Sequence, residues 1–338
     1  MSGRSLFLRK LAVVLLCSGM VSPTAAANEQ TAVGAAPSSL RVFATLVAGR
    51  LESGSILTYL FPVYSFRGGR YRAERLTGPP VPGRYGFERV TAPPGSDAQG
   101  SRFVLRQVRI FTLYERGKLI GQYRVTGTEW IAVSGCRTDL VGVGKPAWLR
   151  HPDFRTGNPG LMNRKENARI VELVAVSGIA RKDVRMIRPH ALPAGERDFL
   201  TAVARERLKQ FVKETALAAK VVPTGALRLV RAFSFDVEQA SRPEVVAEFS
   251  ASIAPVDYGD FSLEAVRISV FAKTGSDRRV LLIVLPYAID LIQPVDLDGD
   301  GKAELLLGYG SGAMNFDLYA LTKGSFINVL GEGVPSYC

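Results

Sequence analysis

The sequence contains few of the residues from which recognisable catalytic sites are built. It has two histidines, His151 and His190, and each lies beside a proline. Neither belongs to an HExxH zinc motif, and the chain has no GxSxG nucleophile turn and no Walker phosphate loop. Cys136 and one histidine could act as nucleophile and base, but isolated pairs of this kind are more often structural. We therefore predict no catalytic residue, and a hydrolase with an active site of unrecognised type is kept as an alternative function.

Long apolar runs are also missing. A membrane-spanning helix needs about 20 apolar residues, whereas the run Leu11–Val21 has 11. This run follows a basic start and precedes Ala25–Ala27, which is the order of parts in a secretory signal peptide. We expect residues 1–27 to be removed and the mature protein to be exported, periplasmic or secreted, with no transmembrane segment. The polar, aperiodic residues 28–38 are predicted to form a disordered lead-in.

Cysteine is scarce as well. Of three cysteines, Cys17 lies in the predicted leader, so that Cys136 and Cys338 remain in the mature chain. An oxidising compartment permits a disulfide between these two. The sequence does not show whether their Cα atoms approach within about 6 Å, so the alternative is two unpaired thiols.

Basic residues are plentiful and unevenly distributed. Residues 41–190 contain 25 Lys and Arg against 11 Asp and Glu, whereas residues 191–338 contain 15 against 19. This asymmetry predicts a boundary near residue 190, between a basic β-rich domain over 39–190 and an α+β domain over 191–338. It also indicates that the basic half carries an interaction surface.

Arginine alternates with aromatic residues most closely between Tyr64 and Arg72. Charge and stacking together favour anionic polymers. For an exported protein we expect the partner to be an anionic polysaccharide or lipid head groups, and no nucleic acid. The alternative is that the arginines decorate an exposed sheet, with their stems covering apolar surface. An adhesion or assembly module is a further alternative function.

The pattern of apolar residues predicts mostly strands. The clearest hairpin joins 103–114 to 119–125 through the turn at 115–118, whereas 76–100 and 136–165 are rich in glycine and proline and are predicted to be irregular. Further strands are predicted at 40–47, 56–66, 130–133, 168–176, 227–237, 245–253, 265–273, 280–287 and 305–307. One long amphipathic helix is predicted over Glu196–Ala219. Strands around a lone helix, without βαβ alternation, indicate an α+β fold that is predominantly antiparallel.

The segment DLDGDGKAE places four carboxylates within nine residues. Asp296, Asp298 and Asp300, at positions 1, 3 and 5, can converge on one hard cation because two glycines allow a tight turn. Lys302 at position 7 would contribute its backbone carbonyl, and Glu304 at position 9 would complete the shell directly or through water. The alternative is an acidic hairpin turn, in which three aspartates would repel one another uncompensated. The pattern therefore predicts calcium, since magnesium demands stricter octahedral geometry.

The flanking sequence decides which kind of calcium loop this is. An EF-hand requires an acidic residue at position 12, where this chain has Leu307. With its following apolar strand and Gly308, the segment resembles the calcium loop of FG-GAP and VCBS-type repeats, which form the blades of integrin-α-like β-propellers. The resemblance implies a strand–loop–strand geometry and ligand roles for the four acids. Because extracellular calcium sites are typically weak, we expect the ion to have a structural role. No second copy is present, so a full β-propeller is not predicted.

Overall fold

The computed structural model describes residues 40–50, 56–82, 88–93, 104–133, 137–150, 171–214, 227–238, 243–257, 262–285, 288–309 and 315–330. Over these residues the chain is strand-rich, its sheets are mostly antiparallel, and one helix has seven or more residues. The predicted fold class is thereby confirmed in outline, including the absence of a full propeller. No described helix is both long enough and apolar enough to cross a membrane.

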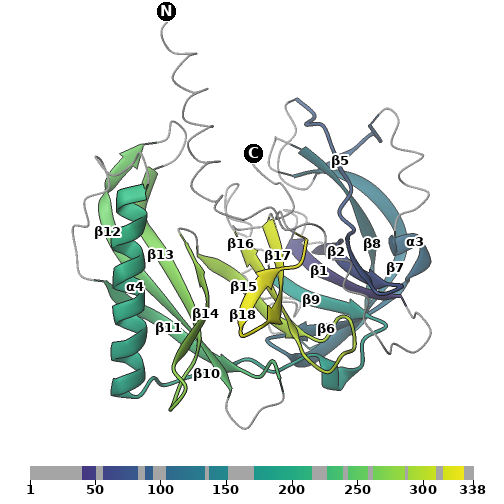
Figure 1. The fold of residues 1–338 in the computed structure, drawn as a ribbon. Coiled ribbons are helices and arrows are strands. Elements are labelled where there is room, and N and C mark those ends of the chain that lie inside the picture. Colours follow the sequence, from purple (N-terminus) through teal and green to yellow (C-terminus); the bar gives the residue numbers. More distant parts are fainter. Residues whose placement is uncertain are drawn as a thin grey trace, which may run out of the picture. The chain divides into compact units, whose positions relative to one another are not determined.

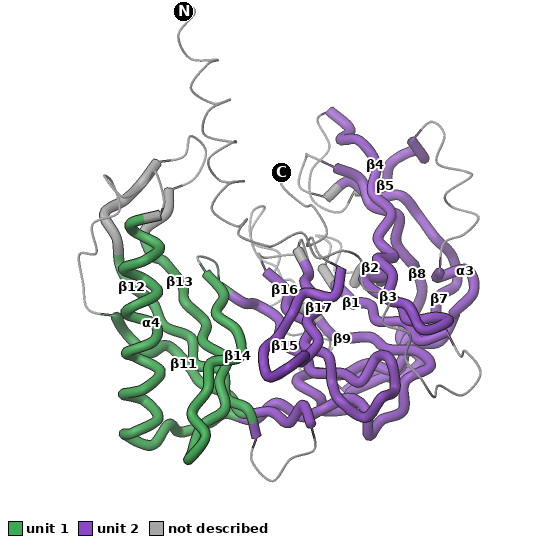
Figure 2. Tube along the Cα trace, viewed as in Figure 1, with its two compact units in different colours: residues 1–33, 189–234, 244–288 green, residues 34–188, 235–243, 289–338 purple. Residues whose placement is uncertain are grey.

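The chain divides into two compact units (Figure 2). The first, here the helix–sheet unit, contains residues 189–234 and 244–288. The second, here the barrel unit, contains residues 34–188, 235–243 and 289–338. The barrel unit is thus assembled from segments on both sides of the helix–sheet unit in the sequence.

Six strands of the barrel unit form a closed ring (Figure 1). They are β1 (Arg41–Arg50), β2 (Ile56–Arg67), β6 (Ile110–Glu115), β7 (Lys118–Val133), β8 (Arg137–Leu149) and β9 (Val171–Ser177). Their order is β2-β1-β9-β6-β7-β8, and the ring closes where Tyr59 and Leu60 of β2 pair with Val143 and Gly142 of β8. The short strands β3 (Arg70–Ala73), β4 (Thr77–Gly78) and β5 (Glu88–Val90) extend this sheet.

The barrel strands are buried on two faces. Inside, apolar residues from all six strands meet Val104 and Leu105 of the one-turn helix α3 (Val104–Gln107). On β1, Leu46 belongs to this interior, whereas Phe43 and Val47 belong to the cluster on the outer face. Burial on both faces explains why the sequence of β1 is almost continuously apolar instead of alternating.

A second antiparallel sheet packs on this outer face. It consists of β15 (Ile289–Val295), β16 (Glu304–Tyr309), β17 (Asn315–Thr322) and β18 (Ser325–Asn328), paired in chain order. Its Val295, Leu306 and Leu318 share one buried cluster with Phe43 and Val174 of the barrel. Between β9 and the helix–sheet unit, the 3-10 turn η2 (Arg181–Asp183) is followed by Val184, which bridges to Val295. The connection between β15 and β16 is the acidic segment.

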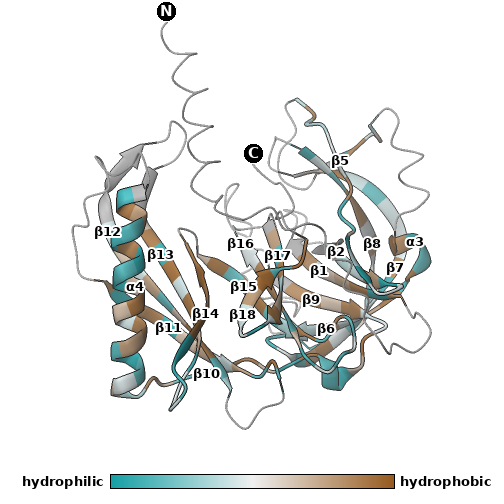
Figure 3. Cartoon of the chain, viewed as in Figure 1, coloured by the Kyte–Doolittle hydropathy of each residue, from teal (hydrophilic) through white to brown (hydrophobic). Residues whose placement is uncertain are grey.

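In the helix–sheet unit, α4 (Ala194–Glu214) covers a five-stranded sheet (Figure 1). The sheet runs β10 (Arg188–Pro189), β11 (Arg228–Phe235), β12 (Glu244–Asp257), β13 (Ser262–Lys273), β14 (Arg279–Val284). Leu200, Ala204 and Leu208 lie at helical spacing and pack against alternate residues of the strands, such as Val245 and Ile268. Figure 3 shows α4 with hydrophilic bands between its hydrophobic ones, as the amphipathic prediction requires. Residues 215–219 lie outside the described chain.

Three predictions of local structure were wrong. Within 76–100, predicted as irregular, the short strands β4 and β5 form. Residues 137–149, predicted as irregular, form the long strand β8. Its glycines allow close packing instead of breaking the strand, because a Cβ on Gly144 would lie 1.9 Å from the carbonyl oxygen of Arg124. The strand predicted from residue 103 begins only at Ile110, because Val104 and Leu105 turn as α3 into the barrel interior.

The units also follow the sequence differently from the predicted domains. A boundary was predicted near residue 190, and the helix–sheet unit does begin its described part at Pro189. The prediction, however, placed the acidic segment with the helix in 191–338. The compact units group residues 289–338 with the barrel, because β15–β17 bury their apolar residues on β1 and β9.

Candidate metal centre

The acidic segment forms a tight loop that is organised by its first carboxylate. Asp296 Oδ1 accepts a hydrogen bond from the Gly299 amide (2.5 Å), and Asp296 Oδ2 accepts one from the Gly301 amide (3.0 Å). Both glycines have positive φ, 83° and 91°, a conformation that other residues rarely adopt. The loop therefore wraps around Asp296, whose side chain is buried.

Glu304, the first residue of β16, closes the loop from the opposite side. Its Oε2 accepts a hydrogen bond from the Leu297 amide at 2.7 Å. Glu304 pairs with Val295 at the end of β15, so the hairpin register fixes the carboxylate over the loop. The Glu304 side chain is buried, and no basic side chain among the described residues forms an ion pair with it.

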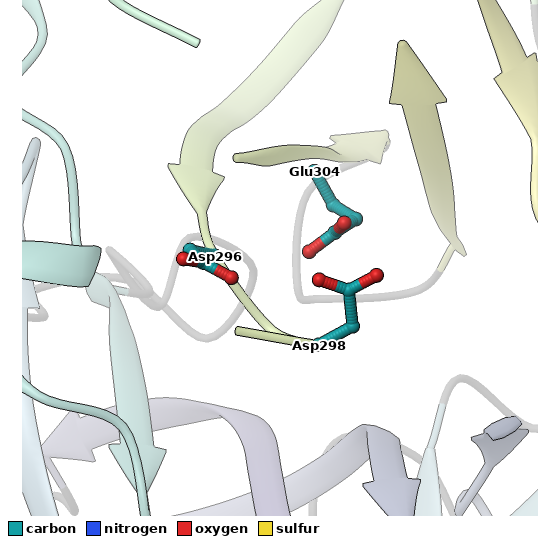
Figure 4. Close-up of side chains that lie close together, drawn as sticks. All are labelled: Asp296, Asp298 and Glu304. Carbon is teal, nitrogen blue, oxygen red and sulfur yellow. The ribbon is translucent and has the colours of Figure 1, made fainter. Parts of the chain in front are cut away.

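Three of the predicted ligands come together. One carboxylate oxygen from each of Asp296, Asp298 and Glu304 lies within 4.8 Å of those of the other two. Figure 4 shows the carboxylates of Asp298 and Glu304 facing each other, with Asp296 to one side. Asp300 is exposed and does not belong to this group, since its Oδ1 accepts the Lys302 amide at 2.7 Å. The Lys302 side chain is exposed, and a role for its carbonyl remains a prediction.

The barrel contributes a tyrosine to the acidic group. The Tyr71 hydroxyl, on β3, lies 2.8 Å from Asp298 Oδ2 and 2.8 Å from Glu304 Oε1, and it is the donor to both. The Tyr71 ring packs against Phe66 on β2, with a centroid distance of 5.0 Å. Its single hydroxyl hydrogen is thereby shared between two carboxylates that would otherwise repel each other.

Two arginines of the barrel unit hold the loop from outside. Arg41 Nη1 donates to the Leu297 carbonyl (3.4 Å) and lies 4.0 Å from Asp296 Oδ1. Its guanidinium lies so close to Gly299 that a Cβ there would come within 2.2 Å of it. Arg185 Nη2 donates to the Gly301 carbonyl at 3.1 Å. One face of the loop is therefore held by Arg41 of β1 and by Arg185 of the segment after η2.

Charge repulsion and burial raise the pKa of all three carboxyl groups. Burial is the main cause in each case. The effect is largest for Glu304, whose pKa rises to about 8 because the Asp298 carboxylate adds to burial, while the Leu297 amide and the Tyr71 hydroxyl act in the opposite direction. The three carboxyl groups are therefore harder to ionise than free ones. Together they offer only oxygen donors, which are the ligands that hard cations prefer.

Sequence reasoning did not find Tyr71, Arg41 or Arg185 as parts of this site. Tyr71 lay in the segment predicted to bind polymers, and only its alternation with Arg70 and Arg72 signalled that it points to another face. Arg70 and Arg72 are exposed, whereas Tyr64 and Phe66 are buried. The structure thus separates the arginines of this segment from its aromatic rings, so they do not form one mixed surface.

The remaining candidate residues are placed as follows. His190 Nε2 lies 3.1 Å from Glu196 Oε2 in the helix–sheet unit. His151, Cys136 and Cys338 lie outside the described residues, as do the predicted signal peptide and the lead-in over 28–38. Whether Cys136 and Cys338 form a disulfide or remain thiols therefore stays open, and export remains a prediction.

Comparison of the chain with protein-family models, curated proteins and solved structures finds no match. The resemblance to FG-GAP and VCBS-type loops therefore rests on the acidic segment alone. The function has to be argued from the geometry of the site.

Proposed function

We propose that this chain binds one calcium ion between Asp296, Asp298 and Glu304, and that the ion stabilises the packing of the second sheet on the barrel. The observation that carries this proposal is the convergence of three carboxylates from a nine-residue loop, two of them buried. A bound cation would neutralise the negative charge of the three carboxylates. The Tyr71 hydroxyl and the Arg41 guanidinium, 4.0 Å from Asp296 Oδ1, offset that charge only in part.

Calcium is favoured by the kind and arrangement of donors. Calcium accepts six to eight oxygen ligands in flexible geometry, including carboxylates, carbonyls and waters. Asp300 and the Lys302 carbonyl are adjacent and could join the shell by a small movement of the exposed part of the loop. Magnesium would require near-ideal octahedral geometry, which a loop with only three converging carboxylates does not impose.

The position of the site supports a structural role. The loop joins two strands of the second sheet, and its carboxylates contact Tyr71 of β3. An ion bound here would tighten the contact between that sheet and the barrel. Extracellular calcium modules bind with dissociation constants near 0.1 to 1 mM, so at ten times the dissociation constant the stabilisation is about 1.4 kcal/mol.

Thermal melting with and without millimolar calcium tests the proposal. Calcium is expected to raise the midpoint of the unaltered protein and to leave that of Asp298→Ala unchanged. Asp198→Ala, an exposed position on α4, is the matched control and should respond as the unaltered protein does. If calcium raised the melting midpoint of all three proteins equally, the loop would not be the calcium site.

We also propose, as a second function, that the barrel unit binds an anionic polymer outside the cell. This is supported by the excess of 14 positive charges over residues 41–190 and by the exposure of basic side chains such as Arg124 and Lys145. Retention on immobilised heparin that falls as salt is added would support this function, because exposed charges are screened by salt. A protein that passes through at low salt would exclude it.

A further inference from the structure

One side of the barrel has no covering layer within the described part of the barrel unit. The outer residues of β6, β7 and β8 form two rows across the strands, and cross-strand partners point to the same face. The rows consist of Ile110, Arg124 and Lys145, and of Thr112, Gln122 and Trp148. We call these six residues the Trp148 face.

The Trp148 face exposes apolar surface near the ends of two strands, since Ile110 is the first residue of β6 and Trp148 the last but one of β8. Trp148 is 41% exposed and Ile110 is 46% exposed. Phe111 follows Ile110 on β6, and Tyr123 follows Gln122 on β7; both are buried in the barrel interior. Because successive side chains of a strand point to opposite faces, Ile110 and Gln122 point outward, and so does Trp148, the partner of Gln122. Val176 on the neighbouring strand β9 pairs with Thr112 and is buried beneath the second sheet, so the cover of that sheet ends beside β6. Exposed large apolar residues gathered on one face are typical of an interaction site.

The same face is positively charged. Arg124 and Lys145 are exposed, and neither forms an ion pair within the part of the chain that the structure describes. The guanidinium of Arg150 lies 5.7 Å from the centre of the Trp148 ring. No carboxylate is present among the six residues of the face. An indole surface beside two exposed cations therefore favours an anionic partner with an apolar face.

We propose that the Trp148 face binds an anionic polysaccharide. The Trp148 ring would stack on the C–H face of a sugar, Gln122 and Thr112 would bond hydroxyl groups, and Arg124 and Lys145 would pair with carboxylate or sulfate groups. This inference rests on the proposed polymer binding and gives it a location and a chemical class.

Two other anionic partners fit the face less well. Single-stranded nucleic acids bind on several aromatic residues that stack successive bases, whereas Trp148 is the one aromatic residue of this face. A lipid surface is entered by several protruding apolar side chains, whereas Trp148 shares its row across the strands with the polar, half-buried residues Gln122 and Thr112. The mixture of one ring, polar groups and cations is that of a site for a charged sugar chain.

Binding of the full chain to polygalacturonate and heparin, measured by affinity electrophoresis, tests this inference. Trp148→Ala and the pair Arg124→Gln with Lys145→Gln are each expected to weaken binding at least fivefold, and the pair should also reduce the salt dependence. The matched control is Arg70→Gln with Arg72→Gln, which removes two exposed charges elsewhere on the barrel and should change binding less than twofold. Circular dichroism melting confirms that each variant is folded.

Several outcomes would overturn the inference. If the control pair abolished binding and Trp148→Ala did not, the polymer would bind elsewhere, and the proposed second function would survive without this location. If the unaltered protein bound neither polysaccharide, both would fail. Tighter binding to single-stranded DNA or to vesicles containing phosphatidylglycerol, lost in Trp148→Ala, would show that the face takes a different partner.

Discussion

The hydroxyl of Tyr71 lies 2.8 Å from the Glu304 carboxylate, although 233 residues separate the two in the sequence. Tyr71 belongs to the barrel and Glu304 to the second sheet, so this hydrogen bond joins the two layers of the barrel unit at the acidic loop. Calcium binding and the packing of these layers are therefore expected to be coupled.

Tyr71→Phe tests this coupling. The change keeps the ring against Phe66 and removes the donor shared by Asp298 and Glu304. Without calcium, we expect the free energy of unfolding to fall by about 1.5–3 kcal/mol, because hydrogen bonds to charged groups contribute at this level. Calcium should still stabilise the variant. Urea denaturation with and without calcium measures both effects, and a variant that no longer responds to calcium would contradict the separation of the two roles.

Stability without calcium should depend on pH through Glu304. Its pKa rises from 4.5 to about 8 in the folded protein, so the folded state keeps a proton that the unfolded state has released. The free energy of unfolding should therefore fall as pH rises from about 4.5 to about 8. Glu304→Gln should flatten this slope, and saturating calcium should also abolish it, since calcium binds the ionised form and Glu304 is then deprotonated in both states. Urea denaturation across this pH range in EDTA and in calcium provides the measurement.

The two loop glycines should respond differently to alanine. Both have positive φ, which costs a non-glycine residue about 1 kcal/mol. At Gly301 the added Cβ meets open space, whereas at Gly299 it meets the Arg41 guanidinium. Gly299→Ala should therefore destabilise the protein more than Gly301→Ala in urea denaturation. Adding Arg41→Ala to Gly299→Ala should abolish that difference, and a persistent difference would point to another cause.

A buried ion pair in the barrel gives a prediction that does not involve the metal. Arg75 Nη2 lies 2.5 Å from Asp139 Oδ2, and both side chains are almost fully buried. Arg137 lies on the other side of the same carboxylate, with its Nε 3.5 Å from Oδ1. Burial and the Arg75 charge lower the pKa of Arg137 to about 10.

Asp139→Asn should accordingly cost about 3–5 kcal/mol of unfolding free energy, because it leaves two buried guanidinium groups without their shared counter-charge. The control is Arg89→Gln, which breaks the pair with Glu129 where Arg89 is 69% exposed. That change should cost less than about 1 kcal/mol. Similar values for the two variants in urea denaturation would contradict the assignment of Asp139 as a buried counter-ion.

Local pattern was sufficient to predict the strands that alternate or are continuously apolar, such as β1 and β12, and the helix α4. The spacing of the acidic residues also predicted that Asp296, Asp298 and Glu304 converge, but it wrongly included Asp300, which is exposed and accepts the Lys302 amide. Local pattern failed for β8, whose glycines are explained only by the close approach of Arg124 on β7.

Local pattern also could not identify Tyr71 or Arg41 as neighbours of the loop. These contacts depend on which face of the barrel the last sheet covers, and that choice is made by apolar residues more than 200 positions apart, such as Phe43 and Leu306. The grouping of residues 289–338 with the barrel also depends on long-range packing. The composition of the two halves therefore could not predict it.

The barrel unit is interrupted in the sequence by the helix–sheet unit, and this has a consequence for biosynthesis. While the chain is being made, the barrel strands emerge first, and the outer face at Phe43, Val174 and Val176 stays bare until β15–β18 have left the ribosome. During that interval a nascent chain offers apolar surface to chaperones and to other chains. Losing the final fifty residues would make this exposure permanent, so a truncated product should aggregate rather than accumulate as a stable barrel.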